Sequence, residues 1–308
     1  MPGRAAPAPA GAGLEVEVRP PWPYRLPRSG GSDAVMRVRR GIVTRLLHVE
    51  GQPVVVRAWQ RRDGTVIFHA LPPAGGRRSE VAIERMRFAL GVDDDYHPMY
   101  ERFRADRLLG TAIRRLRWHR PRRRPWPWEA LAWSITQQLI ESSRAAGIQR
   151  RLVLRWGTRC TGPDGSTLRD VPSAELLAGR APAELAAMDL APARAIALIR
   201  AAREVAKCRV DPADPAGDRR LLAIREIGPW TVQCLGLYGR GEPDSLPAGD
   251  LGFIKVVGRL AGLGRRATIE EVEEFFAPYA PYRGLAGSFV LAAYHKTVAA
   301  GPPLRFAA

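Results

Sequence analysis

The sequence of 308 residues is poor in several residue types, and their scarcity excludes classes of protein. It has three cysteines, Cys160, Cys208 and Cys234, and no two of them have the C-x-x-C spacing of a redox or zinc motif. The five histidines are scattered, so we expect no zinc site. No apolar run is long enough to span a bilayer. These absences predict a cytoplasmic protein with reduced thiols, without a metal centre or a membrane anchor.

Acidic residues are scarce relative to basic ones. The 48 basic and 31 acidic residues give a formal net charge of +17 and a pI of about 11.0, and 45 of the basic residues are arginine. This excess predicts a polyanionic partner, with nucleic acid favoured over an anionic membrane. The densest basic run comprises Arg114, Arg115, Arg117, Arg120, Arg122, Arg123 and Arg124. We expect the proline-rich segment 120–128 to be an exposed, solvated connector, with phosphate contact by this basic run as the alternative.

The N-terminal third shows three kinds of local pattern. Residues 1–20 begin with "MPGRAAPAPAGAG", which lacks the apolar segment of a signal peptide and predicts a disordered leader. Short runs rich in Val and Ile at 15–18, 35–50, 53–59 and 65–71 alternate with turn residues and predict an antiparallel meander. Residues 77–91 have helical periodicity, with Gly91 as a stop. We therefore expect an N-terminal α+β domain over residues 21–95.

The rest of the chain, residues 96–308, has an almost entirely helical pattern. Residues 128–157 form a long amphipathic stretch that predicts more than one helix, and further helices are expected at 192–208, 268–279 and 283–299. A threonine cap and an acidic first turn mark the start of the helix at 268. The chain as a whole is thus predicted to be mainly α.

One short stretch, "EIGPWTV" at 226–232, lies between two helical patterns. Gly228 can adopt a positive φ, and Pro229 suits the first turn of a helix. A helix that begins near Trp230 has unpaired amides and a positive dipole end at this turn. Such a turn binds anions, and for a basic chain the natural anion is a DNA phosphate. Taken alone, the turn is also compatible with a plain connector between helices.

The loop that follows, "GRGEPDSLPAGDLGFIK" at 239–255, has the pattern D-x-x-P-x-x-D at Asp244, Pro247 and Asp250. An I-G-x-W-T hairpin followed by such a loop resembles the helix–hairpin–helix, Gly/Pro-rich-loop, catalytic-Asp (HhH-GPD) superfamily of DNA glycosylases. Within it, the chain is most similar to the bacterial 3-methyladenine DNA glycosylase II family, which has a segment similar to "TQQLIESS" at 136–143.

The resemblance covers about residues 20–300 and implies a fold. A small antiparallel β-sheet domain would precede a two-lobed, all-helical core at 96–308, with a cleft between the lobes. It also implies double-stranded DNA as the partner and a monomeric protein. No cofactor is expected, and no iron–sulfur cluster, because the four-cysteine pattern of some members is missing. In the resembled fold, hairpin carbonyls can bind a monovalent cation.

The resemblance gives Asp250 the catalytic role. Its carboxylate would stabilise the positive charge that develops on the sugar as the base leaves; a helix N-cap is a compatible alternative role. Trp230 stands where bifunctional members carry a Schiff-base lysine, which implies an enzyme without lyase activity. Trp230 and Tyr282 would line the pocket for a cationic alkylated base. The alternatives are core packing for Trp230 and a surface loop for Tyr282.

The resemblance also assigns the DNA contacts. Ile227, Gly228 and Thr231 would bind the backbone at the hairpin. Gln138 and Leu139 would enter the gap left by the flipped base, with a buried helical leucine as the alternative for Leu139.

Three positions depart from the family pattern. Glu226 replaces the first glycine of the hairpin, and its carboxylate would repel phosphate unless it turns away or pairs with Arg225. Cys234 and Leu251 stand where close relatives carry aromatic residues, so the range of bases could differ.

The predicted function is that of a monofunctional DNA glycosylase. It would flip out alkylated purines of the 3-methyladenine and 7-methylguanine type and hydrolyse the N-glycosidic bond, which starts base excision repair. Two alternatives stay open: a glycosylase for 8-oxoguanine or hypoxanthine, and a non-catalytic DNA-damage-binding protein.

Overall fold

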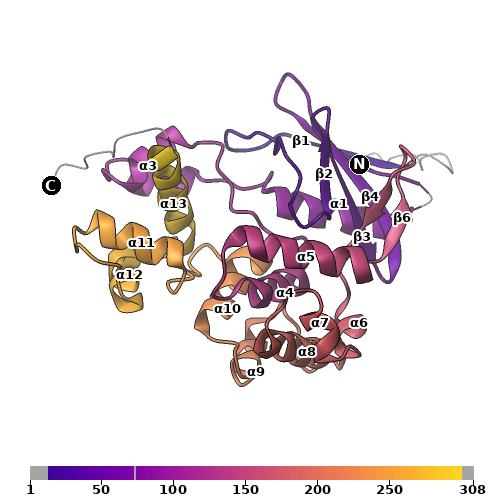
Figure 1. Ribbon diagram of the computed structural model, residues 1–308. Helices are drawn as coiled ribbons and strands as arrows, with labels where there is room; N and C mark the ends of the chain where they lie inside the picture. Colours follow the sequence, from indigo (N-terminus) through magenta and orange to yellow (C-terminus); the bar gives the residue numbers. More distant parts are fainter. Residues whose placement is uncertain (1–12, 73, 300–308) are drawn as a thin grey trace.

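A five-stranded antiparallel sheet and one helix form the N-terminal part of the computed structural model, which describes residues 13–72 and 74–299 (Figure 1). The sheet has the order β1-β5-β4-β3-β2. Its elements are β1 (Leu14–Val18), β2 (Met36–Arg39), β3 (Ile42–Val49), β4 (Gln52–Gln60) and β5 (Val66–Ala70), followed by helix α1 (Arg77–Leu90). The predicted meander and helix are confirmed.

The sheet packs one face against α1 because its strands alternate between apolar and polar residues. Val56 of β4 and Phe68 of β5 are fully buried on this face, together with Ile83 and Met86 of α1. Helix α1 ends at Gly91, whose φ of 65° is the left-handed conformation that closes helices.

The predicted leader is wrong for residues 14–18. These residues form β1, which pairs with β5 in the register Val16↔Phe68 and Val18↔Val66. The reason lies in the sequence "LEVEV": its period of two places Val16 and Val18 against the sheet core, while Glu15 and Glu17 are exposed. Residues 1–12 of the predicted leader lie outside the described residues.

The remaining described chain is helical except for one small hairpin, β6 (Arg159–Thr161) with β7 (Thr167–Arg169). The α-helices are α2 (His97–Phe103), α3 (Leu109–Arg115), α4 (Pro127–Gln137), α5 (Ser142–Trp156), α6 (Ala174–Ala178), α7 (Pro182–Ala186), α8 (Pro192–Ala206), α9 (Asp218–Leu222), α10 (Pro229–Cys234), α11 (Leu251–Leu260), α12 (Ile269–Phe276) and α13 (Arg283–Ala299). Short 3-10 turns lie at Pro215–Gly217 and Ala277–Tyr279, and a π-helical turn at Leu235–Arg240 continues α10. Within the described residues, no helix is both long and apolar enough to cross a bilayer.

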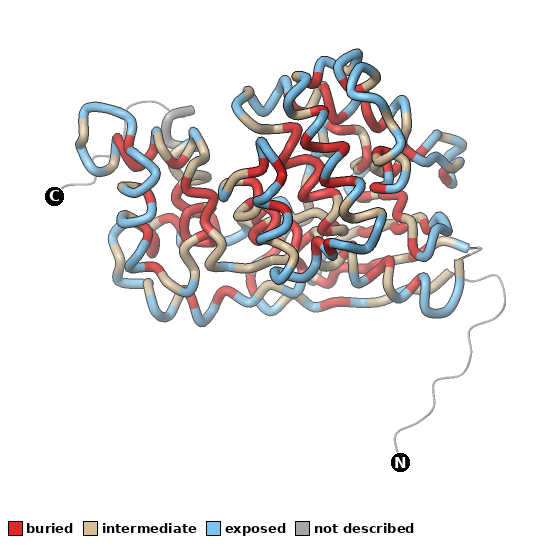
Figure 2. Tube along the Cα trace, turned by 90° about the horizontal axis from the view of Figure 1, so that it is seen from below, coloured by how far each residue is buried: buried red, intermediate tan, exposed pale blue. Residues whose placement is uncertain are grey.

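These helices enclose two separate hydrophobic cores. One core is built by α4 to α10 around Trp133 and Leu198, and the other by α2, α3 and α11 to α13 around Phe253 and Phe289. Figure 1 shows α11, α12 and α13 on one side of the molecule and α4 to α10 on the other, and Figure 2 shows a buried centre in each group. The predicted fold class, a small sheet domain followed by a helical core, is confirmed. We call the two groups the α4–α10 lobe and the C-terminal lobe.

The predicted solvated connector at 120–128 is wrong. Pro121 and Pro125 are buried, and the side chain of Arg123 pairs with Asp94. Arg124 donates hydrogen bonds to Asp33 at 2.8 Å and Glu129 at 3.3 Å. The segment is buried because carboxylates from several elements neutralise its arginines.

Four other arginines of the basic run differ from these. Arg114, Arg115, Arg117 and Arg122 are exposed. The run thus combines internal ion pairs with a solvent-facing side.

Candidate active site

The stretch 226–232 contains the turn between two helices and the start of the second helix, as predicted for a helix–hairpin–helix. Helix α9 ends at Leu222, and α10 begins at Pro229, with Gly228 as its N-cap. Inside the turn, the amides of Ile227 and Thr231 donate to Ile224 O and Gly228 O, both at 3.0 Å. The side chains of Ile227 and Thr231 are buried as well, 4% and 1% exposed. These two residues therefore support the turn from within.

The free donors of the turn belong to other residues. Within the described chain, the backbone amides of Gly228 and Trp230 have no hydrogen-bond partner. A Cβ added at Gly228 would meet nothing within 4 Å, so the Cβ side of this residue is open. Unpaired N–H groups at the start of a helical run suit an anion.

The left-handed residue of the turn is Glu226, with a φ of 76°, whereas Gly228 is extended at a φ of −104°. The expectation that Gly228 takes a positive φ is thus wrong, because the chain reverses direction two residues earlier. A left-handed conformation costs a residue with a Cβ about 1–2 kcal/mol. Glu226 Oε1 lies 3.6 Å from Arg225 Nε, so the carboxylate pairs with its neighbour, one of the two outcomes considered from the sequence.

The break between α4 and α5 lies next to this hairpin. Gln138 donates through Nε2 to Glu226 O at 2.6 Å and to Thr231 Oγ1 at 2.9 Å. The following residue, Leu139, has a φ of 56° and is 92% exposed. The alternative of a buried helical leucine is therefore wrong: Leu139 projects into solvent from a non-helical loop.

Asp250 caps helix α11, as one interpretation of the sequence expected. Its Oδ1 accepts a hydrogen bond from the amide of Gly252 at 2.7 Å, and the residue is only half-buried. The loop before it is fixed by Asp244, which accepts from Nε and N of Arg283 at 2.9 and 3.0 Å. This ion pair attaches the Gly/Pro-rich loop to the first residue of α13.

Asp250 lies close enough to the second helix of the hairpin and its continuation to influence the pKa of two side chains there. Burial and, in addition, the Asp250 carboxylate raise the pKa of the Cys234 thiol. The pKa of Tyr238 is raised by burial first and then by Cys234 and Asp250. The structure thus brings Asp250 within electrostatic range of two side chains from the α10 run, and both are neutral near pH 7.

Trp230 packs against the turn that carries Asp250. A Cβ added at Gly249 would lie 3.7 Å from Trp230 Cβ and 3.6 Å from Ile269 Cδ1. The indole Nε1 of Trp230 is buried and has no hydrogen-bond partner among the described residues. Two large apolar side chains near Asp250 are exposed, Leu251 at 45% and Ile269 at 46%. The turn that carries Asp250 therefore lies against a tryptophan and an isoleucine at Gly249, the residue before it.

Two residues of this region were missed or left open by sequence reasoning. Ile269 follows the threonine cap of α12, and nothing in its local pattern indicates that it approaches Gly249. Tyr282 is half-buried and packs against the core of the C-terminal lobe, just before Arg283. The role of Tyr282 in a base pocket stays a prediction.

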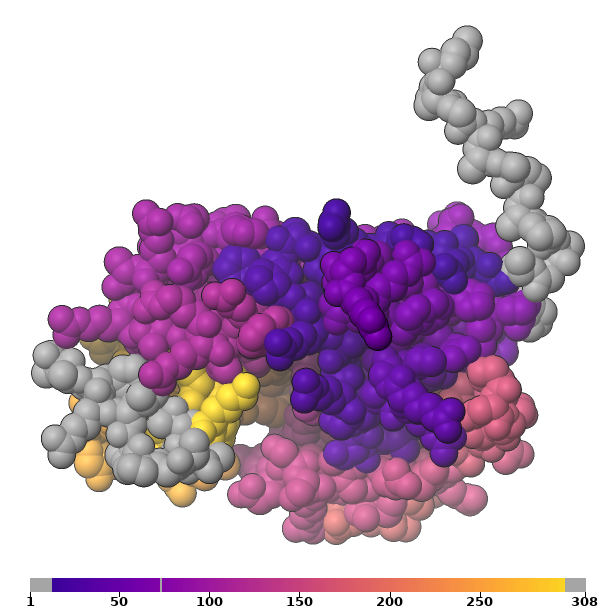
Figure 3. Space-filling view, turned by 90° about the horizontal axis from the view of Figure 1, so that it is seen from above, coloured from indigo at the N-terminus to yellow at the C-terminus, as the bar shows by residue number. Residues whose placement is uncertain are grey.

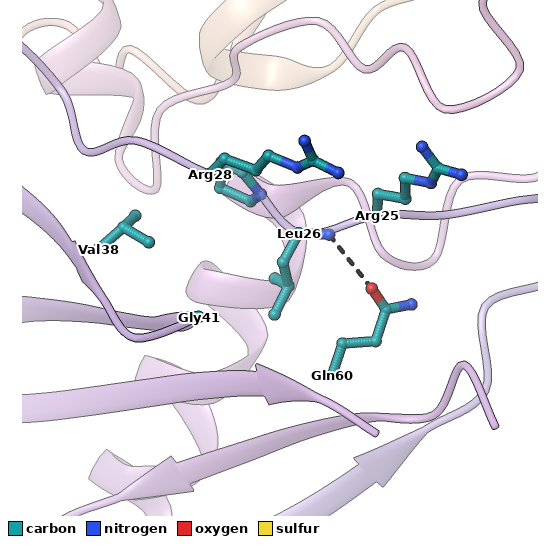
Figure 4. A pocket seen from close by; sticks show the side chains of 7 residues that line it. Arg25, Leu26, Arg28, Val38, Gly41 and Gln60 are labelled. Atoms are coloured by element: carbon teal, nitrogen blue, oxygen red, sulfur yellow. Dashed lines mark hydrogen bonds between the residues drawn. The ribbon is translucent and has the colours of Figure 1, made fainter. Parts of the chain in front are cut away.

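The surface is hollowed between the two lobes. Figure 3 shows a notch between the yellow C-terminal helix and the pink part of the α4–α10 lobe. Two cavities lie elsewhere: one of ≈ 350 Å³ beside Arg25, Arg28 and Gln60 (Figure 4), and one of ≈ 390 Å³ beside Arg200 and Arg220. Asp250, Trp230 and Tyr282 line neither. Over the described ranges, no three His, Cys, Asp or Glu residues are grouped as metal ligands.

Comparisons with known proteins agree with this arrangement. Residues 132–281 match the family described as "HhH-GPD superfamily base excision DNA repair protein". The DNA-3-methyladenine glycosylase of Bacillus subtilis is 26% identical over 201 residues, 63% of this chain and 66% of that protein. The match thus spans slightly less than two thirds of that relative.

Solved structures share the fold. The 3-methyladenine DNA-glycosylase from Archaeoglobus fulgidus superposes with a TM-score of 0.77 at 20% identity, covering 92% of this chain and 98% of that one. The 8-oxoguanine glycosylase/lyase of Clostridium acetobutylicum, solved with double-stranded DNA, has a TM-score of 0.69 at 14% identity, covering 86% and 89%. The hairpin, the Gly/Pro-rich loop and Asp250 all lie inside the matched range, and residues 132–281 of this chain form a domain of the HhH-GPD superfamily of base excision DNA repair proteins.

Proposed function

We propose that the protein is a monofunctional DNA glycosylase that excises alkylated purines of the 3-methyladenine and 7-methylguanine type. One observation carries the proposal: Asp250 is held at the start of α11, beside Trp230 of the hairpin, with its other carboxylate oxygen free of hydrogen bonds among the described residues. A non-catalytic DNA-binding protein has no use for a carboxylate facing a polyanion.

DNA would bind by its backbone at the hairpin. The free amides of Gly228 and Trp230 would hold one phosphate. Ile227 and Thr231, predicted as DNA-binding residues, would act indirectly by shaping the turn. The formal charge of +17 adds a long-range attraction that weakens with salt.

The damaged nucleotide would leave the helix and enter the hollow between the lobes. Extrusion costs a few kcal/mol, and Leu139 would fill the gap in the base stack, as apolar wedges do in other DNA-binding proteins. Trp230, with Tyr282 as the second aromatic candidate, would attract an electron-poor, cationic purine. Leu251 and Ile269 add apolar contact area.

Bond cleavage would depend on Asp250 alone. As the N-glycosidic bond breaks, positive charge grows on the sugar, and a nearby carboxylate stabilises it and can orient or deprotonate the attacking water. The water oxygen bonds to C1′, and the base leaves with the bonding electrons. A cationic base leaves readily, so no acid catalyst is required. Cys234 and Tyr238 stay neutral near pH 7 and supply no competing charge.

The absence of lyase activity follows from the amine chemistry. A lyase of this kind needs a primary amine at the sugar to form a Schiff base. The chain has three lysines, Lys207, Lys255 and Lys296, and the hairpin position holds Trp230. We infer further that the protein acts as a monomer on double-stranded DNA in the cytoplasm. Binding of a monovalent cation by hairpin carbonyls stays a prediction.

The test is release of free bases from three duplexes, which contain 7-methylguanine, hypoxanthine or 8-oxoguanine. We expect 7-methylguanine to appear in solution and the strand to stay intact until alkali is added. Strand breaks without alkali would contradict the monofunctional mechanism. Release of only 8-oxoguanine or hypoxanthine would show that the enzyme acts on that lesion instead. No release from any duplex would favour the alternative of a non-catalytic damage-binding protein.

A further inference from the structure

The loop between α4 and α5 holds Leu139 in an unfavourable state. Its φ of 56° costs a leucine about 1–2 kcal/mol, and its side chain, 92% exposed, gains no burial in return. A conformation of this kind persists only where the surroundings determine it. The contacts of the neighbouring residues show what those surroundings are.

Arg194 fixes the loop from helix α8. Its Nη1 donates to Thr136 O at 3.1 Å and to Gln138 O at 3.0 Å. These carbonyls belong to the last turn of α4, where backbone acceptors have no partner within the helix. One guanidinium therefore holds the end of α4 and the residue before Leu139 in a single geometry.

Gln138 fixes the same loop from the other side. Its carboxamide reaches Glu226 O at 2.6 Å and Thr231 Oγ1 at 2.9 Å. Glu226 is the left-handed residue of the hairpin, and Thr231 is 1% exposed in α10. The two strained residues of this surface, Leu139 and Glu226, are thus joined through the hydrogen bonds of one side chain, Gln138.

We propose that Gln138 and Arg194 are positioning residues that hold Leu139 in a fixed position relative to the hairpin. The binding of a phosphate by the hairpin would then determine where Leu139 enters the duplex. The proposal rests on the function proposed above and adds a coupling between its two DNA contacts. It also gives Gln138 a role in the free protein, before any DNA is bound. Neither residue touches the reacting base.

The first test uses Arg194→Met and Gln138→Met, which keep side-chain length and remove the donors. Base release is measured under single-turnover conditions from one oligonucleotide with 7-methylguanine, as a duplex and as a single strand. We expect the duplex rate to fall by about tenfold, because a misplaced wedge fails to hold the extruded state. The single-strand rate should change little, since no partner strand has to be displaced.

Arg200→Met is the matched control. Arg200 lies on the same helix as Arg194 and is exposed, and its side chain has no ion pair or hydrogen bond in the described part of the chain. The Arg200→Met variant loses the same charge as Arg194→Met but leaves the contacts of the loop intact. Its ratio of duplex to single-strand rates should therefore match that of wild type. Equal losses on duplex and single strand in the Arg194 or Gln138 variants would refute the positioning role.

The second test does not need base release. Amide hydrogen exchange of residues 138–141 is measured in the free proteins, and 2-aminopurine fluorescence is measured in a duplex with an abasic-site analogue opposite the fluorophore. In both variants we expect faster amide exchange than in wild type and a smaller rise of 2-aminopurine fluorescence when the protein is added. Values equal to those of wild type would overturn the inference. If wild type released no base but the two variants still differed from it in exchange and fluorescence, the proposed function would fail while the coupling stood.

Discussion

The basic connector and the hairpin differ in how they present donors to negative charge. In the connector, Arg123 and Arg124 are turned inward and pair with Asp94, Asp33 and Glu129. The hairpin segment has one neighbouring arginine, Arg225, yet it offers free backbone amides at the start of α10. A dense run of basic residues in the sequence therefore does not by itself indicate an exposed anion site, because part of its charge is used in internal ion pairs.

The connector's charges instead hold parts of the fold together. Arg124 meets Asp33 from the N-terminal domain and Glu129 from α4, and its amide donates to Tyr238 O at 2.8 Å. Burial by itself would raise the pKa of Asp33, but Arg124, Arg45 and a hydrogen bond from Trp133 outweigh it and lower that pKa. The ion pairs thus join the sheet domain to the lobe that carries Leu139.

Removing one connector charge should have the largest effect on stability. In Arg124→Gln, the carboxylates of Asp33 and Glu129, 4% and 1% exposed, lose a partner. Breaking a buried ion pair costs about 3 kcal/mol or more. We expect urea unfolding to show this loss, while the dependence of DNA binding on salt concentration keeps its slope.

Arg122→Gln is the control for this comparison. Arg122 lies two residues away and is exposed, so its loss should change the free energy of unfolding by less than about 0.5 kcal/mol. If the two variants were equally stable, the distinction between internal and solvent-facing arginines in this run would be wrong.

A smaller effect is expected at the hairpin. Glu226→Gly relieves the left-handed φ of 76° and removes a carboxylate from the proposed phosphate site. The free energy of unfolding should rise by up to about 1 kcal/mol, since glycine takes this conformation without a steric penalty but loses more backbone entropy. Binding to undamaged duplex should tighten. Weaker binding would show that the Glu226 side chain assists the hairpin.

Much of the fold could be predicted from local sequence patterns, because the regular strands and helices have clear hydrophobic periodicity and are bounded by turn residues. The strands around Val43 and Val56, the helix that ends at Gly91 and the break inside 128–157 were all expected from periodicity and turn residues. The leader was wrong at Leu14–Val18 because its boundary, drawn at residue 20, included the alternating run 15–18 that also predicted a strand.

The residues of the candidate site that belong to a sequence motif could be predicted. The residues that reach the site only through tertiary contacts could not. Trp230 and Asp250 belong to a spaced pattern, and the structure brings their segments together. No local signal indicates that Arg194 reaches the carbonyls of α4, or that Ile269 approaches Gly249. The left-handed residue was misplaced at Gly228 because the residue type suggested it, although the chain strains Glu226 instead.

The most direct measurement compares Asp250→Asn with wild type in single-turnover base release and in binding to the same 7-methylguanine duplex. Asparagine caps helices as well as aspartate does, so the variant should fold normally. We predict that release falls by at least about 10²–10³-fold, while the duplex is bound as tightly or more tightly because a negative charge facing it is gone. Release at the wild-type rate would contradict the account, because the carboxylate at the start of α11 would then have no part in breaking the glycosidic bond.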